Sequence, residues 1–123
     1  MSPSFEVLAT IAATICFVLA VVWSLAPQRL LSLWGVAYSQ PAGLVSRRGA
    51  ALFLGIGVMF FLARSAELSV GRSALSAGFA VVCLALAALG VMELVRKRAG
   101  IGILSAVLVE VALAVAFLFQ LLK

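Results

Sequence analysis

The chain has 123 residues, of which 66% are hydrophobic and 11% are charged, and its formal net charge is +5. A soluble domain is closer to half apolar and a quarter charged, so this composition excludes an ordinary water-soluble fold and favours lipid as the solvent. The sequence contains neither His nor Asp, which excludes His-based metal sites and Ser-His-Asp triads.

The first apolar run covers residues 5–25 and matches the roughly 20 residues that cross a bilayer core. No Lys or Arg precedes it and Glu6 opens it, so we expect a retained membrane span rather than a cleaved signal peptide. Pro27 is expected to end this helix, because proline removes a backbone donor from the helix interior.

Residues 28–46 are too few and too polar to cross a membrane. Residues 29–38 place apolar side chains at helical spacing, so we expect a short helix lying in the headgroup layer. Trp34 and Tyr38 would anchor it at the interface, and the alternative is an aromatic lid over a substrate entrance. The chain is expected to turn back at Pro41 and Gly43.

Three further apolar runs cover residues 47–65, 73–94 and 101–122. Small residues in the first two of these runs would let helix backbones pack closely in lipid. These residues are Ala51, Gly55, Gly57, Gly78 and Gly90. We therefore predict an all-α integral membrane protein with a single transmembrane domain. Its four spans form an antiparallel bundle, with the short interfacial helix between the first two.

Basic residues are distributed unevenly over the connections between these spans. Arg29, Arg47, Arg48, Arg96, Lys97 and Arg98 fall on one side of the membrane, and Arg64, Arg72 and Lys123 fall on the other. The positive-inside rule makes the first side cytoplasmic, so both termini face outward from a bacterial inner membrane. The arginines and lysine of residues 47–48 and 96–98 either fix this topology or contact anionic lipid. Since topology explains the charge, no nucleic-acid partner is expected.

One acid, Glu110, lies in the middle of the last run. It is roughly 13 Å from the end of its span, and Thr14 lies at a similar depth on the first. The first and last helices of such a bundle are neighbours, so we expect a hydrogen bond between these two side chains. No cation lies at that depth, so the acid is expected to be neutral. Two interpretations of Glu110 stay open. It is a structural acid that holds helices together, or it is a site that binds a proton or a cation.

The remaining residues point to no cofactor and no metal. Cys16 and Cys83 are isolated within apolar runs and form neither a CxxC motif nor a disulfide framework. Such cysteines behave as small buried hydrophobic residues.

The second span carries a pattern that resembles a known group of proteins. Arg48 and Gly49 open the span, Gly55 and Gly57 follow, and Arg64 closes it. This pattern resembles the small four-helix bacterial membrane proteins loosely called DoxX-like. The resemblance implies a compact antiparallel bundle with no agreed activity, and a soluble redox partner has been associated with the family name.

Three functions fit these observations. The first is an accessory, structural or lipid-interacting protein whose partners are the bilayer and either further copies or a larger membrane complex. The second is a proton-linked carrier of a small cationic or lipophilic solute that uses Glu110. The third is a membrane enzyme acting on a lipid or quinone. The sequence does not support it, because nothing pairs a nucleophile with a base. A carrier requires a cavity that reaches Glu110, whereas a structural role requires Glu110 to be sealed against a helix.

Overall fold

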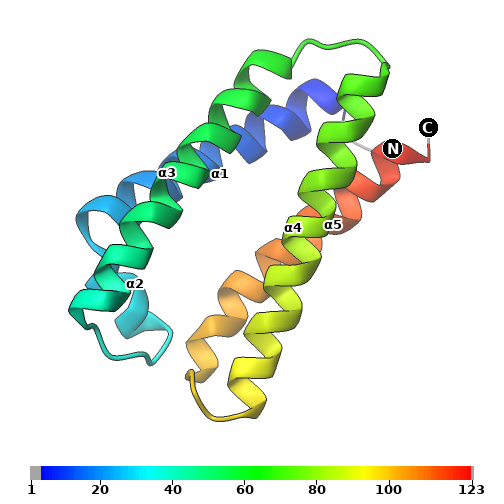
Figure 1. The fold of residues 1–123 in the computed structure, drawn as a ribbon. Coiled ribbons are helices and arrows are strands. Elements are labelled where there is room, and N and C mark those ends of the chain that lie inside the picture. The colour runs from blue at the N-terminus through cyan, green and yellow to red at the C-terminus, as the bar shows by residue number, and fades with distance from the viewer. Residues whose placement is uncertain (1–3, 123) are drawn as a thin grey trace.

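The computed structural model describes residues 4–122 as helices joined by short connections, with no strand in that range (Figure 1). The elements are α1 (Phe5–Leu25), α2 (Pro27–Leu33), α3 (Gln40–Ala63), α4 (Val70–Val95), the 3-10 helix η1 (Ile101–Ile103) and α5 (Leu104–Leu121). Helices α1, α3 and α4, and η1 together with α5, are long and apolar enough to cross a membrane. The predicted all-α fold with four membrane-length helices is confirmed.

Serine side chains set the starts of three of these helices. Ser4, Ser39 and Ser69 each accept a hydrogen bond of 3.2 Å from a backbone N–H in the first turn of α1, α3 and α4. The first four N–H groups of a helix have no partner within it, so a serine at this position satisfies one of them.

Helix α3 begins at Gln40 rather than near residue 47, and α2 ends at Leu33 rather than at residue 38. Pro41 and Gly43 do not turn the chain back, because both lie within α3. Pro41 is in the first turn of α3, where its missing N–H costs nothing and its fixed backbone angle suits a helix. The chain reverses earlier, at Gly35, which has a φ of 71°.

The long helices pack as two pairs, α1 along α3 and α4 along α5 (Figure 1). The pairs share a core near the ends that hold the start of α1 and the end of α5. Rings of Phe60, Phe79 and Phe117, from three different helices, have centroids 4.9 to 5.3 Å apart. Helix α1 contributes small residues to this core, including Ala9 and Ala12, which are fully buried.

The opposite ends of the two pairs meet through the backbone. Gly100 N–H donates to the Trp34 carbonyl oxygen over 2.6 Å. A Cβ on Gly35 would lie only 2.8 Å from Gly100 N, and a Cβ on Gly102 would collide with the Leu33 carbonyl oxygen. The connection that follows α2 therefore packs closely against the connection between α4 and α5.

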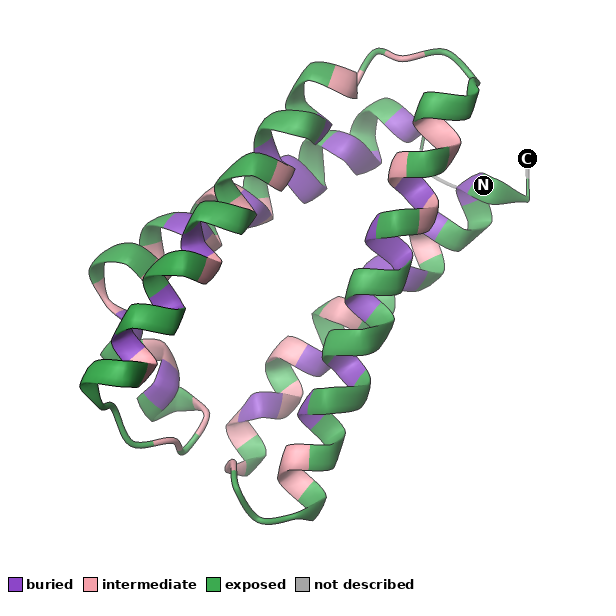
Figure 2. Cartoon of the chain, viewed as in Figure 1, coloured by how far each residue is buried: buried purple, intermediate pink, exposed green. Residues whose placement is uncertain are grey.

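The outward faces of the long helices are exposed (Figure 2), and large apolar side chains lie on these faces. Leu52 and Leu62 on α3 are 70% and 75% exposed, and Val81 and Leu108 on α4 and α5 are 65% and 71% exposed. Exposing such large apolar faces to water is unfavourable in free energy, so lipid or another protein must cover them.

Candidate functional site

Glu110 lies on α5 and is half-buried. Across residues 4–122 its carboxyl group makes no hydrogen bond and no ion pair. The packing of this chain alone therefore neither seals the acid against a helix nor neutralises it with a cation.

Thr14 does not partner Glu110. It lies on an exposed position of α1, and its hydroxyl donates to the Thr10 carbonyl oxygen over 2.8 Å. The prediction of a bond between Thr14 and Glu110 is wrong for two reasons. Helix α1 packs mainly on α3 rather than on α5. A threonine inside a helix also bonds readily to the carbonyl four residues earlier.

Cys83 on α4 lies within electrostatic range of Glu110 and of Cys16. Both cysteines are buried and free, as predicted. Ala114, one turn after Glu110, is fully buried in the shared core, whereas Ala106, one turn before, is half-buried. No group of three or more His, Cys, Asp or Glu residues within the described part of the chain is placed to hold a metal ion.

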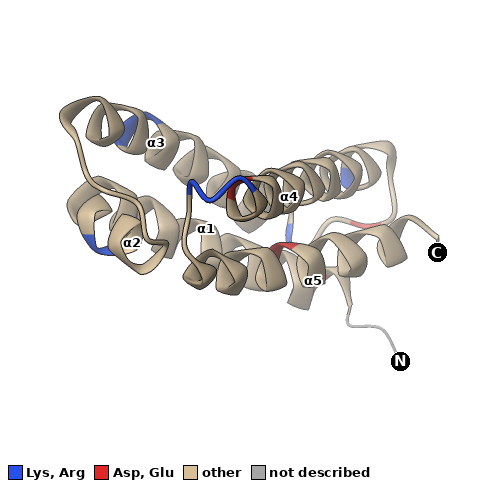
Figure 3. Ribbon diagram, turned by 90° about the horizontal axis from the view of Figure 1, so that it is seen from below, with Lys and Arg blue, Asp and Glu red and all other residues tan. Residues whose placement is uncertain are grey.

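The predicted basic residues lie on α2, near the start of α3 and in the connection after α4, as the blue segments of Figure 3 show in a view from below. Arg47 and Arg48 are exposed on α3, and Arg96 and Lys97 are exposed just beyond α4. Arg98 is neutralised by Glu93 through two hydrogen bonds of 2.7 Å. The other four have no acidic partner among residues 4–122, so this end of the molecule, where the connections after α2 and α4 meet, carries uncompensated positive charge.

The two predicted interfacial aromatics also lie at this end, in different environments. Trp34 packs edge-to-face on Trp23 at the end of α1, with ring centroids 5.3 Å apart. Tyr38 is 40% exposed and lies in the connection between α2 and α3. Its ring covers Gly43 so closely that a Cβ there would collide with the Tyr38 hydroxyl.

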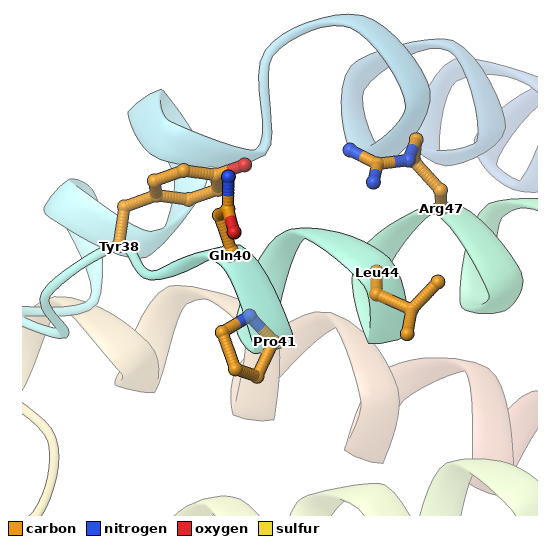
Figure 4. Close-up of a pocket in the computed structure, with 5 residues that line it drawn as sticks. All are labelled: Tyr38, Gln40, Pro41, Leu44 and Arg47. Carbon is orange, nitrogen blue, oxygen red and sulfur yellow. The ribbon is translucent and has the colours of Figure 1, made fainter.

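Tyr38 borders a hollow of about 570 Å³ (Figure 4). The lining residues are Tyr38, Gln40, Pro41, Leu44 and Arg47. A second hollow, of about 400 Å³, is also bordered by Tyr38 and is lined otherwise by residues of α2 and of the connection after it. Both hollows lie at the basic end of the chain, and Glu110 lines neither of them.

The structure adds a buried polar cluster that sequence reasoning missed. Arg72 Nη2 donates to Gln120 Oε1 over 2.9 Å, and the guanidinium carbon lies 4.5 Å from the centre of the Phe5 ring. Ser76 is 1% exposed, and its hydroxyl has no hydrogen-bond partner among the described residues. Ser76 and Gln120 are polar residues within apolar runs. That pattern is the sequence signal that would have identified them as candidate site residues. The cluster links the start of α4 to the end of α5 and to α1.

The chain matches no protein-family model, no curated protein and no solved structure. The resemblance to DoxX-like proteins therefore stays an expectation, and the functional argument rests on the geometry of Glu110 and of the basic end.

Proposed function

We propose that this protein is a small multi-pass membrane protein that works as an accessory subunit, assembling with other membrane helices through the face of α5 that carries Glu110. The observation that carries the proposal is the carboxyl group of Glu110, which is half-buried in mid-helix and has no partner within residues 4–122. Acids at this depth are costly unless something satisfies them, so the missing partner must come from beyond residues 4–122, and we place it on another membrane helix.

The proposed placement is an antiparallel crossing of a bacterial inner membrane, with the basic end in the cytoplasm and both termini outside. It is supported by the four membrane-length helices and by cations at one end of the molecule. Lys123, which belongs to the predicted outer side, lies outside the described residues.

Cysteine labelling tests this placement. Single cysteines introduced at Ser39 and at Ala99 are expected to react with a membrane-impermeant thiol reagent only after the cytoplasmic side is opened, because both positions belong to the basic end. A cysteine at Glu67, in the connection between α3 and α4, is the control and should react from outside. Labelling of Ser39 and Ala99 from outside would invert the placement.

The first partner to test is a second copy of this chain, because closed symmetric assemblies of one chain are the most common kind. In lipid, a protonated carboxyl group can both donate and accept, so two such groups satisfy each other without any cation. A hydrogen bond between membrane helices contributes about 1 kcal/mol, enough to bias an association that packing supports.

Counting fluorescently labelled subunits in liposomes, by single-molecule photobleaching, measures this assembly. Glu110→Ala is expected to shift the population towards monomers, whereas Glu110→Gln keeps a donor and an acceptor and should stay close to the parent protein. Val109→Ala, at an adjacent exposed position, is the matched control. A parent protein that is monomeric at every density would rule out a second copy as the partner of Glu110, and a Glu110→Ala variant that assembles normally would overturn assembly through Glu110.

A proton-linked carrier is the second candidate, because Glu110 is half-buried and has no partner among residues 4–122, although it lines neither hollow. The two functions separate in one measurement. A carrier binds a lipophilic cation such as tetraphenylphosphonium more strongly as pH rises, and Glu110→Gln abolishes that binding while leaving the subunit count unchanged.

A further inference from the structure

We propose that the hollow between Tyr38 and Arg47 is a binding site for the phosphate group of an anionic membrane lipid. The inference rests on the membrane placement proposed above and is independent of assembly through Glu110. It concerns a different end of the molecule and different helices.

Two elements build the hollow. Gln40, Leu44 and Arg47 lie on one face of α3 because residues four and seven positions apart share a helix face. Tyr38 comes from the preceding connection and is held in place by its close packing over Gly43. In Figure 4 the Arg47 guanidinium, the Tyr38 hydroxyl and the Gln40 amide lie above the α3 ribbon, whereas Pro41 and Leu44, which also line the hollow, lie below it.

The polar groups of this hollow suit a phosphate. Arg47 is exposed and has no acidic partner among the residues that the structure describes, so its positive charge is free for a ligand. A guanidinium presents a planar fork of donors that matches phosphate oxygens. The hollow also lies at the start of α3, a helix of 24 residues, where the helix dipole adds further positive potential.

Depth favours a lipid as the source of the phosphate. Helix α3 is roughly 36 Å long, whereas the hydrocarbon core of a bilayer is about 30 Å thick. The uninterrupted apolar part of α3 begins only after Arg48, so its first turns belong to the headgroup layer. Lipid phosphates lie in that layer, at the level of the hollow.

The surface beneath the hollow suits an acyl chain. Ala51 and Gly55 continue the face of Arg47 by one and two turns towards the membrane centre, and both are exposed. A Cβ on Gly55 would meet nothing within 4 Å, so the helix presents a shallow apolar strip there. A soluble phosphate compound has no acyl chain to pack on this strip. A phospholipid bound at Arg47 would pack an acyl chain along it.

Arg47 and Arg48 provide a matched test, because both are exposed on α3 and only Arg47 lines the hollow. The full chain in detergent is titrated with phosphatidylglycerol and with phosphatidylcholine, and native mass spectrometry counts the bound lipid. We expect preferential binding of phosphatidylglycerol, weakened by roughly tenfold or more in Arg47→Gln, since a hydrogen bond to a charged group is lost. Arg48→Gln should bind within about twofold of the parent, since it loses only a distant charge.

Equal losses in the two variants would overturn the site, because they would show that the basic end attracts anionic lipid without a defined position. Thermal unfolding of both variants checks that each is folded.

Tyr38→Phe should weaken binding in the same direction as Arg47→Gln, because it removes the hydroxyl donor and keeps the ring. Inorganic phosphate and glycerol 3-phosphate are added as competitors, and displacement of the lipid at equal concentration would assign the hollow to a soluble phosphate compound instead. None of these outcomes bears on the subunit count of the Glu110 variants.

Discussion

Gly102 lies where η1 touches the end of α2, and it leaves no room for a larger residue. A Cβ there would collide with the Leu33 carbonyl oxygen, which is backbone and cannot rotate away. We expect Gly102→Ala to destabilise the protein by about 1–3 kcal/mol, the usual cost of overpacking, and to lower the midpoint of thermal unfolding in detergent. Gly55→Ala is the control, since its Cβ meets nothing within 4 Å. If both variants unfold at the same temperature, the contact between η1 and α2 does not stabilise the folded protein.

Other small residues show how far sequence reasoning reaches at this scale. Close packing is predicted at four glycines of the second and third apolar spans, Gly55, Gly57, Gly78 and Gly90, and two of these four do pack closely. A Cβ on Gly57 would lie 2.8 Å from Phe17, and one on Gly90 would lie 2.8 Å from Val107. Gly55 and Gly78 instead face open space. A sequence shows that a residue is small, but the neighbour that fills the space depends on which helices pair.

Glu110 illustrates the same limit for a polar residue. Its place near the middle of the last helix follows from counting residues along an apolar run, and the structure retains it in mid-helix. Its predicted partner required the first and last helices to be neighbours along their length, and they are not. The position of a residue along its helix can be counted from the sequence. The side chain that contacts it depends on how the helices pack together.

The start of helix α3, like the starts of α1 and α4, is capped by a serine side chain. Ser39 accepts from the Ala42 N–H over 3.2 Å and so satisfies one of the free donors in the first turn. Ser39→Ala is expected to destabilise this turn by about 1 kcal/mol. Hydrogen exchange measured over residues 40–46 should then speed up, while exchange in α1 stays unchanged. Ser65→Ala, at an exposed position with no side-chain hydrogen bond among the described residues, is the control. Unaltered exchange in the Ser39 variant would show that Pro41 alone fixes the start of α3.

The other helix boundaries divide between those that sequence predicts and those that it does not. Helix α1 has the predicted bounds, because a continuous apolar run between a polar start and Pro27 leaves little choice. The start of α3 differs, because nine residues of mixed polarity precede Gly49 and hydropathy does not register a serine cap. The end of α4 is marked by Lys97, whose φ of 60° breaks the helix and brings Arg98 back to Glu93. A left-handed lysine carries no sequence signal of the kind that glycine gives.

Across the whole molecule, the two helix pairs are joined near both ends. One junction is the backbone contact between Trp34 and Gly100, and the other combines the phenylalanine core with the hydrogen bond from Arg72 to Gln120. The sequence predicts four spans and the basic end, but it does not predict pairing of α1 with α3 and of α4 with α5. Hydropathy gives each helix an apolar surface on most sides, so it does not distinguish the face that meets a neighbour from the face that meets lipid.

Phe117 tests whether the phenylalanine core holds the two pairs together. Its side chain is fully buried against Phe60 and Phe79, whereas Phe119, on the same helix, is 54% exposed. We expect Phe117→Ala to cost about 3–5 kcal/mol, because it removes a buried ring and leaves a cavity between the pairs. Phe119→Ala should cost far less, since lipid or detergent replaces the lost contacts.

The two native cysteines report directly on the separation of the pairs. Cys16 on α1 and Cys83 on α4 are 1% and 3% exposed, and both belong to the shared core. If Phe117 holds the pairs together, Phe117→Ala should raise the rate at which a small thiol reagent labels both cysteines under conditions where the helices remain intact by circular dichroism. Phe119→Ala should leave that rate unchanged, because the core is untouched. Labelling that stays slow in the Phe117 variant, despite a lower unfolding midpoint, would show that the pairs remain joined by their other contacts. The phenylalanine core would then stabilise each pair separately rather than the junction between them.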